Sequence, residues 1–187
     1  MSAGVVLAVV VLAASLAACA SSGGAREAPS QDARGGDAVH EVPGRFTIAP
    51  DDYHVPFAGT AEDGRRFFLS QELFSIGDPG SSYVGLFLWK ADGTFDEVRV
   101  DEVARPDGLP LAQAAPAGAD ALVADRLAEL GDYVLEPIEV EPFTEEVDGV
   151  TFGWRLGRHD DGSYALHVEP GDFIVYYAPW DGLDYDP

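Results

Sequence analysis

The sequence has little positive charge. It contains 11 Lys and Arg against 33 Asp and Glu, for a formal net charge of −22, and its only adjacent basic pair is Arg65-Arg66. Nucleic-acid binding needs clustered cations that displace counterions, so this composition excludes a nucleic-acid partner and disfavours direct binding to anionic lipid headgroups. Cys19 is the only cysteine. No intramolecular disulfide can therefore form, and the fold must rest on its core alone.

The sequence also lacks readable catalytic signatures. It has no GxSxG elbow, Walker loop, HExxH, paired CxxC or complete EF-hand loop. This absence does not exclude an enzyme, because many hydrolases carry their catalytic acids on strands without a signature. Hydrophobic residues make up 47% of the 187 residues and aromatic residues 11%. These shares argue against wholesale disorder, and the length suits one domain.

The amino-terminal residues 1–18 contain no charged side chain and must enter a membrane or be removed. They lead into Leu16-Ala17-Ala18-Cys19, which is an aliphatic residue, two small residues and a cysteine. This pattern resembles the lipobox of bacterial lipoprotein precursors. The resemblance implies a signal peptide over 1–18, cleavage before Cys19 and a diacylglyceryl group on its thiol. An uncleaved anchor helix and an ordinary signal peptide are the alternatives, since the usual basic residue before the apolar run is absent.

Residues 19–38 are predicted to be a flexible tether. From Ala20 to Ala38 there is no Val, Ile, Leu, Met or aromatic residue. About 20 such residues in a coil reach roughly 25 Å, which lifts the folded part clear of the bilayer. A single acidic, β-rich domain is predicted over 39–187. All readings of the amino terminus export this domain, and the lipobox places it on the outer face of the cell membrane.

Alternation of apolar and polar side chains predicts that most of the domain is β-strand. The clearest case is 150–156, where Val150, Phe152 and Trp154 share one face. After a polar loop the pattern resumes in 164–168, which predicts a hairpin. The other predicted strands are 45–49, 53–57, 65–69, 83–89, 95–103, 134–140 and 173–178. Two of these, 83–89 and 173–178, are apolar on both faces and should be covered on both sides.

One helix is predicted near 120–130. Val123, Leu127 and Leu130 fall at i, i+4 and i+7, Asp120 can cap its start, and Gly131 can end it. The overall prediction is an α+β fold that is mainly antiparallel β, as a sandwich or a strongly bent sheet, with this one main helix. Residues 56–67 and 142–152 also resemble each other at an offset of 85 or 86 positions, through either duplication or coincidence.

Two groups of residues are candidates for chemistry. His54 and His159 each have neighbouring carboxylates that can orient an imidazole or share a cation, and Trp180 is a candidate to line a cleft with them. The second group consists of carboxylates near the carboxyl terminus, Asp181, Asp184 and Asp186. Their hard oxygen atoms suit calcium, which would be the cofactor of this domain. The ordinary alternatives are solvated histidines and a solvated tail whose aromatic residues pack back on the sheet.

These features predict a lipid-anchored extracytoplasmic lipoprotein, held in the membrane through Cys19, with a non-catalytic binding or interaction domain. The expected partner is a basic protein or peptide, because a negative field repels anionic polymers and favours basic surfaces. One alternative is a carboxylate-based hydrolase that acts on cell-envelope sugars or peptides, and another is a calcium-stabilised surface module. A hydrolase should show two acids that converge in a concave site, at least one with a raised pKa, whereas a binding domain should spread its acids outward.

Overall fold

The computed structural model describes residues 42–76, 80–103, 118–183 and 185–186, the last two through their backbone alone. All of them belong to one compact unit, Gly35–Pro187. They form three antiparallel sheets and one short helix, so the predicted mainly antiparallel β fold with one main helix is confirmed. The predicted signal peptide, Cys19 and the tether over 19–38 lie outside the described residues.

The first sheet has five strands in the order β5-β4-β3-β2-β6. Its members along the chain are β2 (Phe57–Thr60), β3 (Arg66–Ser75), β4 (Ser81–Trp89), β5 (Phe95–Val103) and β6 (Val134–Leu135). An Asp-Gly turn joins β4 to β5. Asp92 Oδ1 accepts hydrogen bonds from the backbone N of Thr94 at 3.0 Å and from its Oγ1 at 2.7 Å, and Gly93 has φ +83°. Glycine adopts this conformation without steric cost, so the turn follows from local sequence.

The second sheet also has five strands, in the order β12-β11-β10-β9-β8. Its members are β8 (Thr144–Val147), β9 (Val150–Arg158), β10 (Tyr164–Glu169), β11 (Val175–Tyr177) and β12 (Tyr185–Asp186). The predicted hairpin of 150–156 and 164–168 is present, with Leu156 opposite Leu166. A third, two-stranded sheet pairs β1 (Phe46–Ile48) with β7 (Ile138–Val140).

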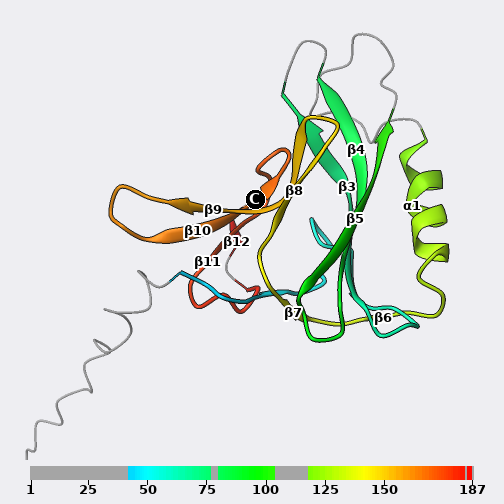
Figure 1. Ribbon diagram of the computed structural model, residues 1–187, viewed down its shortest axis with the longest axis horizontal. Coiled ribbons are helices and arrows are strands. Elements are labelled where there is room, and N and C mark those ends of the chain that lie inside the picture. Colours follow the sequence, from blue (N-terminus) through cyan, green and yellow to red (C-terminus); the bar gives the residue numbers. More distant parts are fainter. Residues whose placement is uncertain (1–41, 77–79, 104–117, 184, 187) are drawn as a thin grey trace, which may run out of the picture. The chain divides into compact units, whose positions relative to one another are not determined.

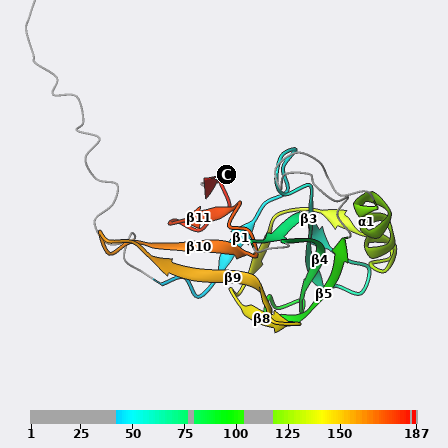
Figure 2. The same cartoon turned by 90° about the horizontal axis from the view of Figure 1, so that it is seen from above.

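Strand β4 explains how the layers are built. Its residues from Tyr83 to Trp89 are all buried, as the unbroken apolar run predicts. Tyr83, Phe87 and Trp89 belong to a main core that also takes residues from the second sheet, whereas Leu86 and Leu88 face a smaller core shared with the helix. Figures 1 and 2 show the helix on one side of the first sheet and the second sheet on the other. The two larger sheets thus share one core, which is the sandwich alternative of the prediction.

The helix α1 (Ala119–Ala128) lies close to its predicted position. Val123 and Leu130 are buried in the smaller core and Leu127 packs against it, as the spacing predicts. The predicted cap at Asp120 is wrong, because the helix starts after Gly118, which has φ +104° and provides no side-chain cap. Asp120 lies in the first turn, where a negative charge still favours the helix dipole. Gly131 has φ +69° and follows the last turn, as expected.

Two of the weaker strand predictions need correction. Residues 53–57 are mostly a turn, because Asp51 Oδ1 accepts hydrogen bonds from the backbone N of Tyr53 at 2.8 Å and of Val55 at 2.9 Å. Such a turn competes with strand pairing. Residues 134–140 form two short strands of different sheets, β6 and β7, interrupted at Pro137. The apolar run 173–178 shortens to β11, which lies next to the edge strand β12.

Candidate functional site

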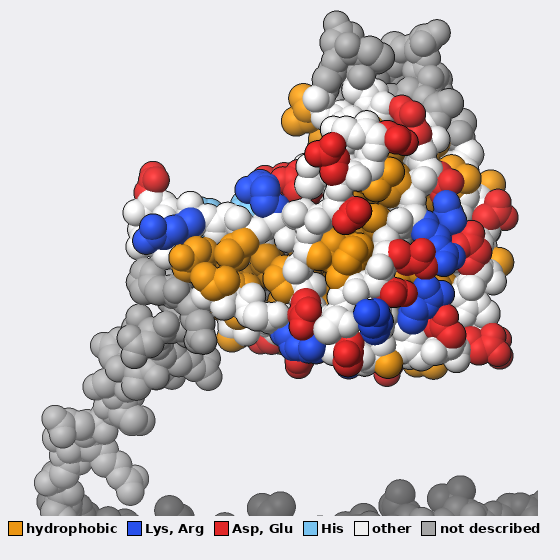
Figure 3. Space-filling view, in the orientation of Figure 1, with side chains coloured by type: hydrophobic (Ala, Val, Ile, Leu, Met, Phe, Trp, Pro, Cys, Tyr) orange, Lys and Arg blue, Asp and Glu red, His pale blue; other side chains and the backbone are white. Residues whose placement is uncertain are grey.

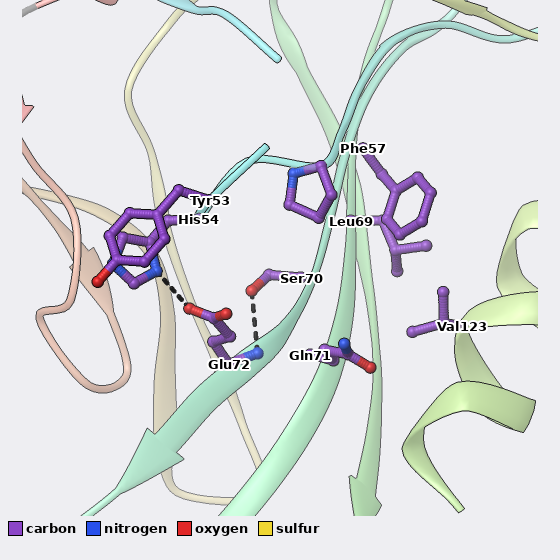
Figure 4. A pocket seen from close by; sticks show the side chains of 9 residues that line it. Tyr53, His54, Phe57, Leu69, Ser70, Gln71, Glu72 and Val123 are labelled. Carbon is purple, nitrogen blue, oxygen red and sulfur yellow. Dashed lines mark hydrogen bonds and ion pairs between the residues drawn. The ribbon is translucent and has the colours of Figure 1, made fainter. Parts of the chain in front are cut away.

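A pocket lies where the turn around His54 meets β3 and α1 (Figure 4). It has a volume of about 80 Å³. Its lining consists of Tyr53, His54, Pro56, Phe57, Leu69, Ser70, Gln71, Glu72 and Val123. One water takes about 30 Å³ of liquid volume, so the pocket has room for a few waters. Sites for small organic ligands usually occupy roughly 300 Å³ or more.

The polar centre of this pocket is an imidazole–carboxylate pair. His54 Nδ1 lies 2.5 Å from Glu72 Oε2, and Figure 4 shows the two side chains pointing toward each other. The ring of His54 also lies 3.9 Å from the ring of Tyr53 and 5.7 Å from that of Phe173, measured between centroids. The His54 side chain is 15% exposed and the Glu72 side chain 42%. The pair is therefore a surface contact that fixes the ring against aromatic neighbours.

Glu72 reaches His54 because β3 is irregular at this point. The pairing of β3 with β4 shifts between Ser70 and Leu73, which is a bulge or a similar irregularity. The backbone N of Glu72 donates to Ser70 Oγ at 3.1 Å, as drawn in Figure 4. Bulges redirect side chains and are common next to binding sites. Gln71, which the irregularity contains, has a buried Oε1 without a hydrogen-bond partner among the described residues.

Two other histidines lie close together, His167 on β10 and His159 in the loop between β9 and β10. His167 Nδ1 lies 2.6 Å from Asp172 Oδ1. The ring of His159 is 6.2 Å from that of His167 and 6.0 Å from that of Tyr177. Gly157 leaves room for this arrangement, because a Cβ there would lie 2.7 Å from His167 Nε2. His54 and His159 thus belong to two separate groups of contacts, each with its own neighbours.

Trp180 joins neither histidine group. Its side chain is partly buried against the main core, and its carbonyl oxygen accepts a hydrogen bond from the backbone N of Thr47 at 2.8 Å. Asp181 is exposed, and its Oδ1 accepts from the backbone N of Leu183 at 3.1 Å. Asp184 and the side chain of Asp186 lie outside the described residues, so the calcium site stays a prediction. Within the described ranges no three His, Cys, Asp or Glu side chains are grouped to hold a metal ion.

Several acidic side chains form a network with arginines where β5 meets α1. Arg99 Nη1 lies 2.7 Å from Glu129 Oε2, and Arg126 Nε lies 2.7 Å from an oxygen of Asp101. Glu97 contacts two arginines of this network, Arg65 and Arg99. Figure 3 shows interleaved basic (blue) and acidic (red) patches on the side of the first sheet that carries α1. The network ties the edge of the first sheet to the helix.

The electrostatics of these acids favour the ionised form. The hydrogen bond from Arg99 holds the pKa of Glu97 below its ordinary value. The backbone N–H of Arg65 lowers the pKa of Asp63 in the same way, and that of Thr94 lowers the pKa of Asp92. A general acid needs the opposite shift, toward a raised pKa. These three carboxylates are therefore suited to structural pairing and not to proton donation near neutral pH.

Sequence reasoning picked out His54 and His159 as candidates, but it missed the carboxylates that contact His54 and His167. Glu72 is 18 positions from His54 and meets it across the fold. Asp172, which contacts His167, lies in the turn after β10 and has φ +53°. The two-residue period of a strand does not indicate such a conformation. Of the acids near the histidines in sequence, Asp51 accepts hydrogen bonds from the backbone N of Tyr53 and Val55, and Asp161 accepts one from the backbone N of Ser163.

No family model, curated protein or solved structure matches the chain. Within the described residues no helix has the length and hydropathy that a membrane span requires.

Proposed function

We propose that this chain is a lipid-anchored extracytoplasmic lipoprotein whose folded domain binds a partner outside the membrane without catalysis. The observation that carries the proposal is Leu16-Ala17-Ala18-Cys19 at the end of an uncharged apolar run. A thioether-linked diacylglyceryl group supplies two acyl chains, and each buried methylene contributes about 0.8 kcal/mol to membrane binding. One chain binds reversibly, whereas two anchor stably. Residues 19–38 then act as the tether.

The proposed partner is a basic protein or peptide. A net charge of −22 creates a negative field that accelerates association with positive surfaces and repels other anions. Exposed acids in several different segments support this reading, among them Asp96 on β5, Glu145 on β8 and Asp160 in the β9–β10 loop. Their spread suits recognition of an extended basic surface better than chemistry at one point.

Two features weigh against the hydrolase alternative. The pocket beside His54 has a volume of about 80 Å³, too small for a sugar ring and its neighbours. The carboxylates with lowered pKa values at Asp63, Asp92 and Glu97 are ionised partners of donors, whereas glycoside hydrolysis needs one protonated carboxyl group. Binding therefore fits the described side chains better than acid catalysis does.

The anchor is tested by replacing its only thiol. Bacteria that express the parent chain, Cys19→Ala or Ser21→Ala are grown with labelled palmitate and then fractionated. We expect label and membrane retention for the parent and for Ser21→Ala, the matched control two positions away, and loss of the label for Cys19→Ala. Unchanged labelling and retention of Cys19→Ala would refute the lipid anchor. Recovery of the chain from the cytosol with residues 1–18 intact would also remove the proposed location.

A further inference from the structure

Strand β5 is the one long edge among the strands of the described residues. The other edge strands of the two larger sheets have two residues in β6, two in β12 and four in β8, whereas β5 has nine. Proteins usually keep edges short or cover them, because an open edge is a template for pairing. Within the described part of the chain, β5 pairs with β4 alone. In an antiparallel ladder every second residue then directs its N–H and C=O away from the partner strand.

An apolar strip lies beside this edge, on the side that faces the second sheet. It consists of partly buried side chains that pack against the main core, Phe95, Val98, Val100, Phe143, Val147 and Val150. The rings of Phe95 and Phe143 stack with centroids 3.7 Å apart. Figure 3 shows hydrophobic surface in this region between β8 and β5, bordered by acidic side chains. A strand added to β5 would place every second side chain over this strip.

The charges around the edge decide which strand fits. Asp96 and Glu102 are exposed on β5, and Glu145 is exposed on β8 on the same face as Val147. A second copy of the chain would bring acids against acids, which disfavours self-pairing through this edge. A strand that alternates apolar residues with Lys or Arg would instead cover the strip and place its cations near these carboxylates.

We propose that β5 is the docking site of the basic partner, and that an extended basic segment of that partner adds to the first sheet as a strand beside β5. This inference rests on the proposed function and adds the place and the mode of binding. Backbone hydrogen bonds to the β5 edge supply affinity, the apolar strip selects alternate apolar side chains, and the bordering acids select basic residues.

The test uses the full chain in detergent micelles and a fluorescent nine-residue peptide of alternating Val and Lys. Two further peptides carry N-methyl groups on the odd or on the even residues, with side chains and charge unchanged. Only one of these two sets of N–H groups faces β5 in an added strand. We expect one methylated peptide to bind at least about tenfold more weakly and the other to bind nearly as well as the parent peptide. Hydrogen exchange should slow in 95–103 when the parent peptide binds.

Charge-reversal variants test the acidic border. Glu102→Lys with Glu145→Lys should weaken peptide binding at least about tenfold, because two attractive contacts become repulsive. The matched control, Asp132→Lys with Asp160→Lys, makes the same change in net charge at exposed sites in two other loops and should stay within about twofold.

The outcomes separate this inference from the proposed function. If both methylated peptides bind like the parent peptide, or if exchange slows outside 95–103, strand addition at β5 is wrong while binding of a basic partner stands. If the two charge-reversal pairs weaken binding equally, the docking site is not at β5. If the Val–Lys peptide fails to bind even at low ionic strength, the basic partner itself is wrong.

Discussion

At the scale of single residues, Gly153 shows how a backbone conformation holds the second sheet together. It has φ +126° in the middle of β9 and is paired with Thr144 on β8 and Glu169 on β10. A Cβ at this position would lie 2.3 Å from the carbonyl oxygen of Phe143, which is backbone and cannot move away easily. That same oxygen accepts a hydrogen bond from the backbone N of Trp154 at 2.6 Å. Only glycine satisfies these conditions without strain.

Replacing this glycine should therefore destabilise the fold without touching any charged group. We expect Gly153→Ala to lower the free energy of unfolding by about 1 to 3 kcal/mol, the usual cost of a strained backbone conformation. Gly44→Ala is the control, because a Cβ there meets nothing within 4 Å. Urea unfolding of both variants measures the difference. Equal midpoints for the two variants would contradict the assigned role of Gly153.

The candidate site also shows what sequence proximity could and could not predict. The acids beside His54 and His159 in the sequence suggested partners, yet His54 contacts Glu72 on a different element. In a sheet, side chains meet across strands, and adjacent residues point to opposite faces. The irregularity in β3 that redirects Glu72 interrupts the two-residue period, so no pattern announces it. The histidines were predictable as candidates, but their partners required the fold.

At the scale of secondary-structure elements, the local alternation of apolar and polar side chains predicted the hairpin of β9 and β10. The turns at Asp92-Gly93 and Asp148-Gly149 carry positive φ values at their glycines, and both join antiparallel strands. Strand pairing across long separations, such as β1 with β7, has no local signal and was not predicted. The contact between β5 and α1 also has no local signal. It depends on Arg99 and Arg126, which meet acids on β5 and at the end of α1.

This arginine–carboxylate network should make stability depend on pH in the acid range. The folded-state pKa values of Glu97 and Asp63 lie below their ordinary values of 4.5 and 3.8. Groups of this kind stabilise the fold above their unfolded-state pKa, and the contribution is lost as pH falls through the folded-state pKa. Stability should therefore fall as the pH drops from 5 toward 3.

Glu97→Gln isolates one carboxylate of the network. At pH 7 we expect the variant to be less stable than the parent by about 0.2 to 1 kcal/mol, the range of exposed ion pairs. At pH 3 the difference should shrink, because the parent also loses this charge. Glu146→Gln, which removes an exposed carboxylate from β8, controls for the loss of one negative charge. Denaturant unfolding at both pH values is the measurement, and a difference that grows at pH 3 would contradict the assigned sign.

At the scale of the whole described domain, two successive meanders share one core. Strands β2 to β5 follow each other in the first sheet, and β8 to β12 do so in the second. The similar segments 56–67 and 142–152 fall at the first hairpin of each meander, but the turns differ. Thr60 pairs with Arg66 across five residues, 61 to 65, whereas Val147 pairs with Val150 across two, 148 and 149. The packing of the meanders depends on contacts between distant residues, which is why the sequence left the sandwich and the bent sheet as alternatives.

Trp154 lies at the centre of that shared core, and the core as a whole should make the two larger sheets unfold together. Trp154 is 1% exposed, and its ring lies 5.1 Å from Phe46 on β1, 5.8 Å from Phe68 on β3 and 5.2 Å from Tyr176 on β11. These contacts join all three sheets. Removing the ring therefore weakens every interface at once, whereas a change confined to one sheet would leave the others intact.

We expect Trp154→Ala to lower the free energy of unfolding by about 3 to 5 kcal/mol, as for other buried aromatic residues. The transition should stay single, with the fluorescence of Trp89 and Trp180 and the circular dichroism changing together. The control is Leu156→Ala, on the same strand, because Leu156 is 39% exposed. This change should lower the free energy of unfolding by about 1 kcal/mol or less. Two separate transitions in Trp154→Ala, with the first sheet and α1 surviving through their smaller core, would mean that the sheets fold independently.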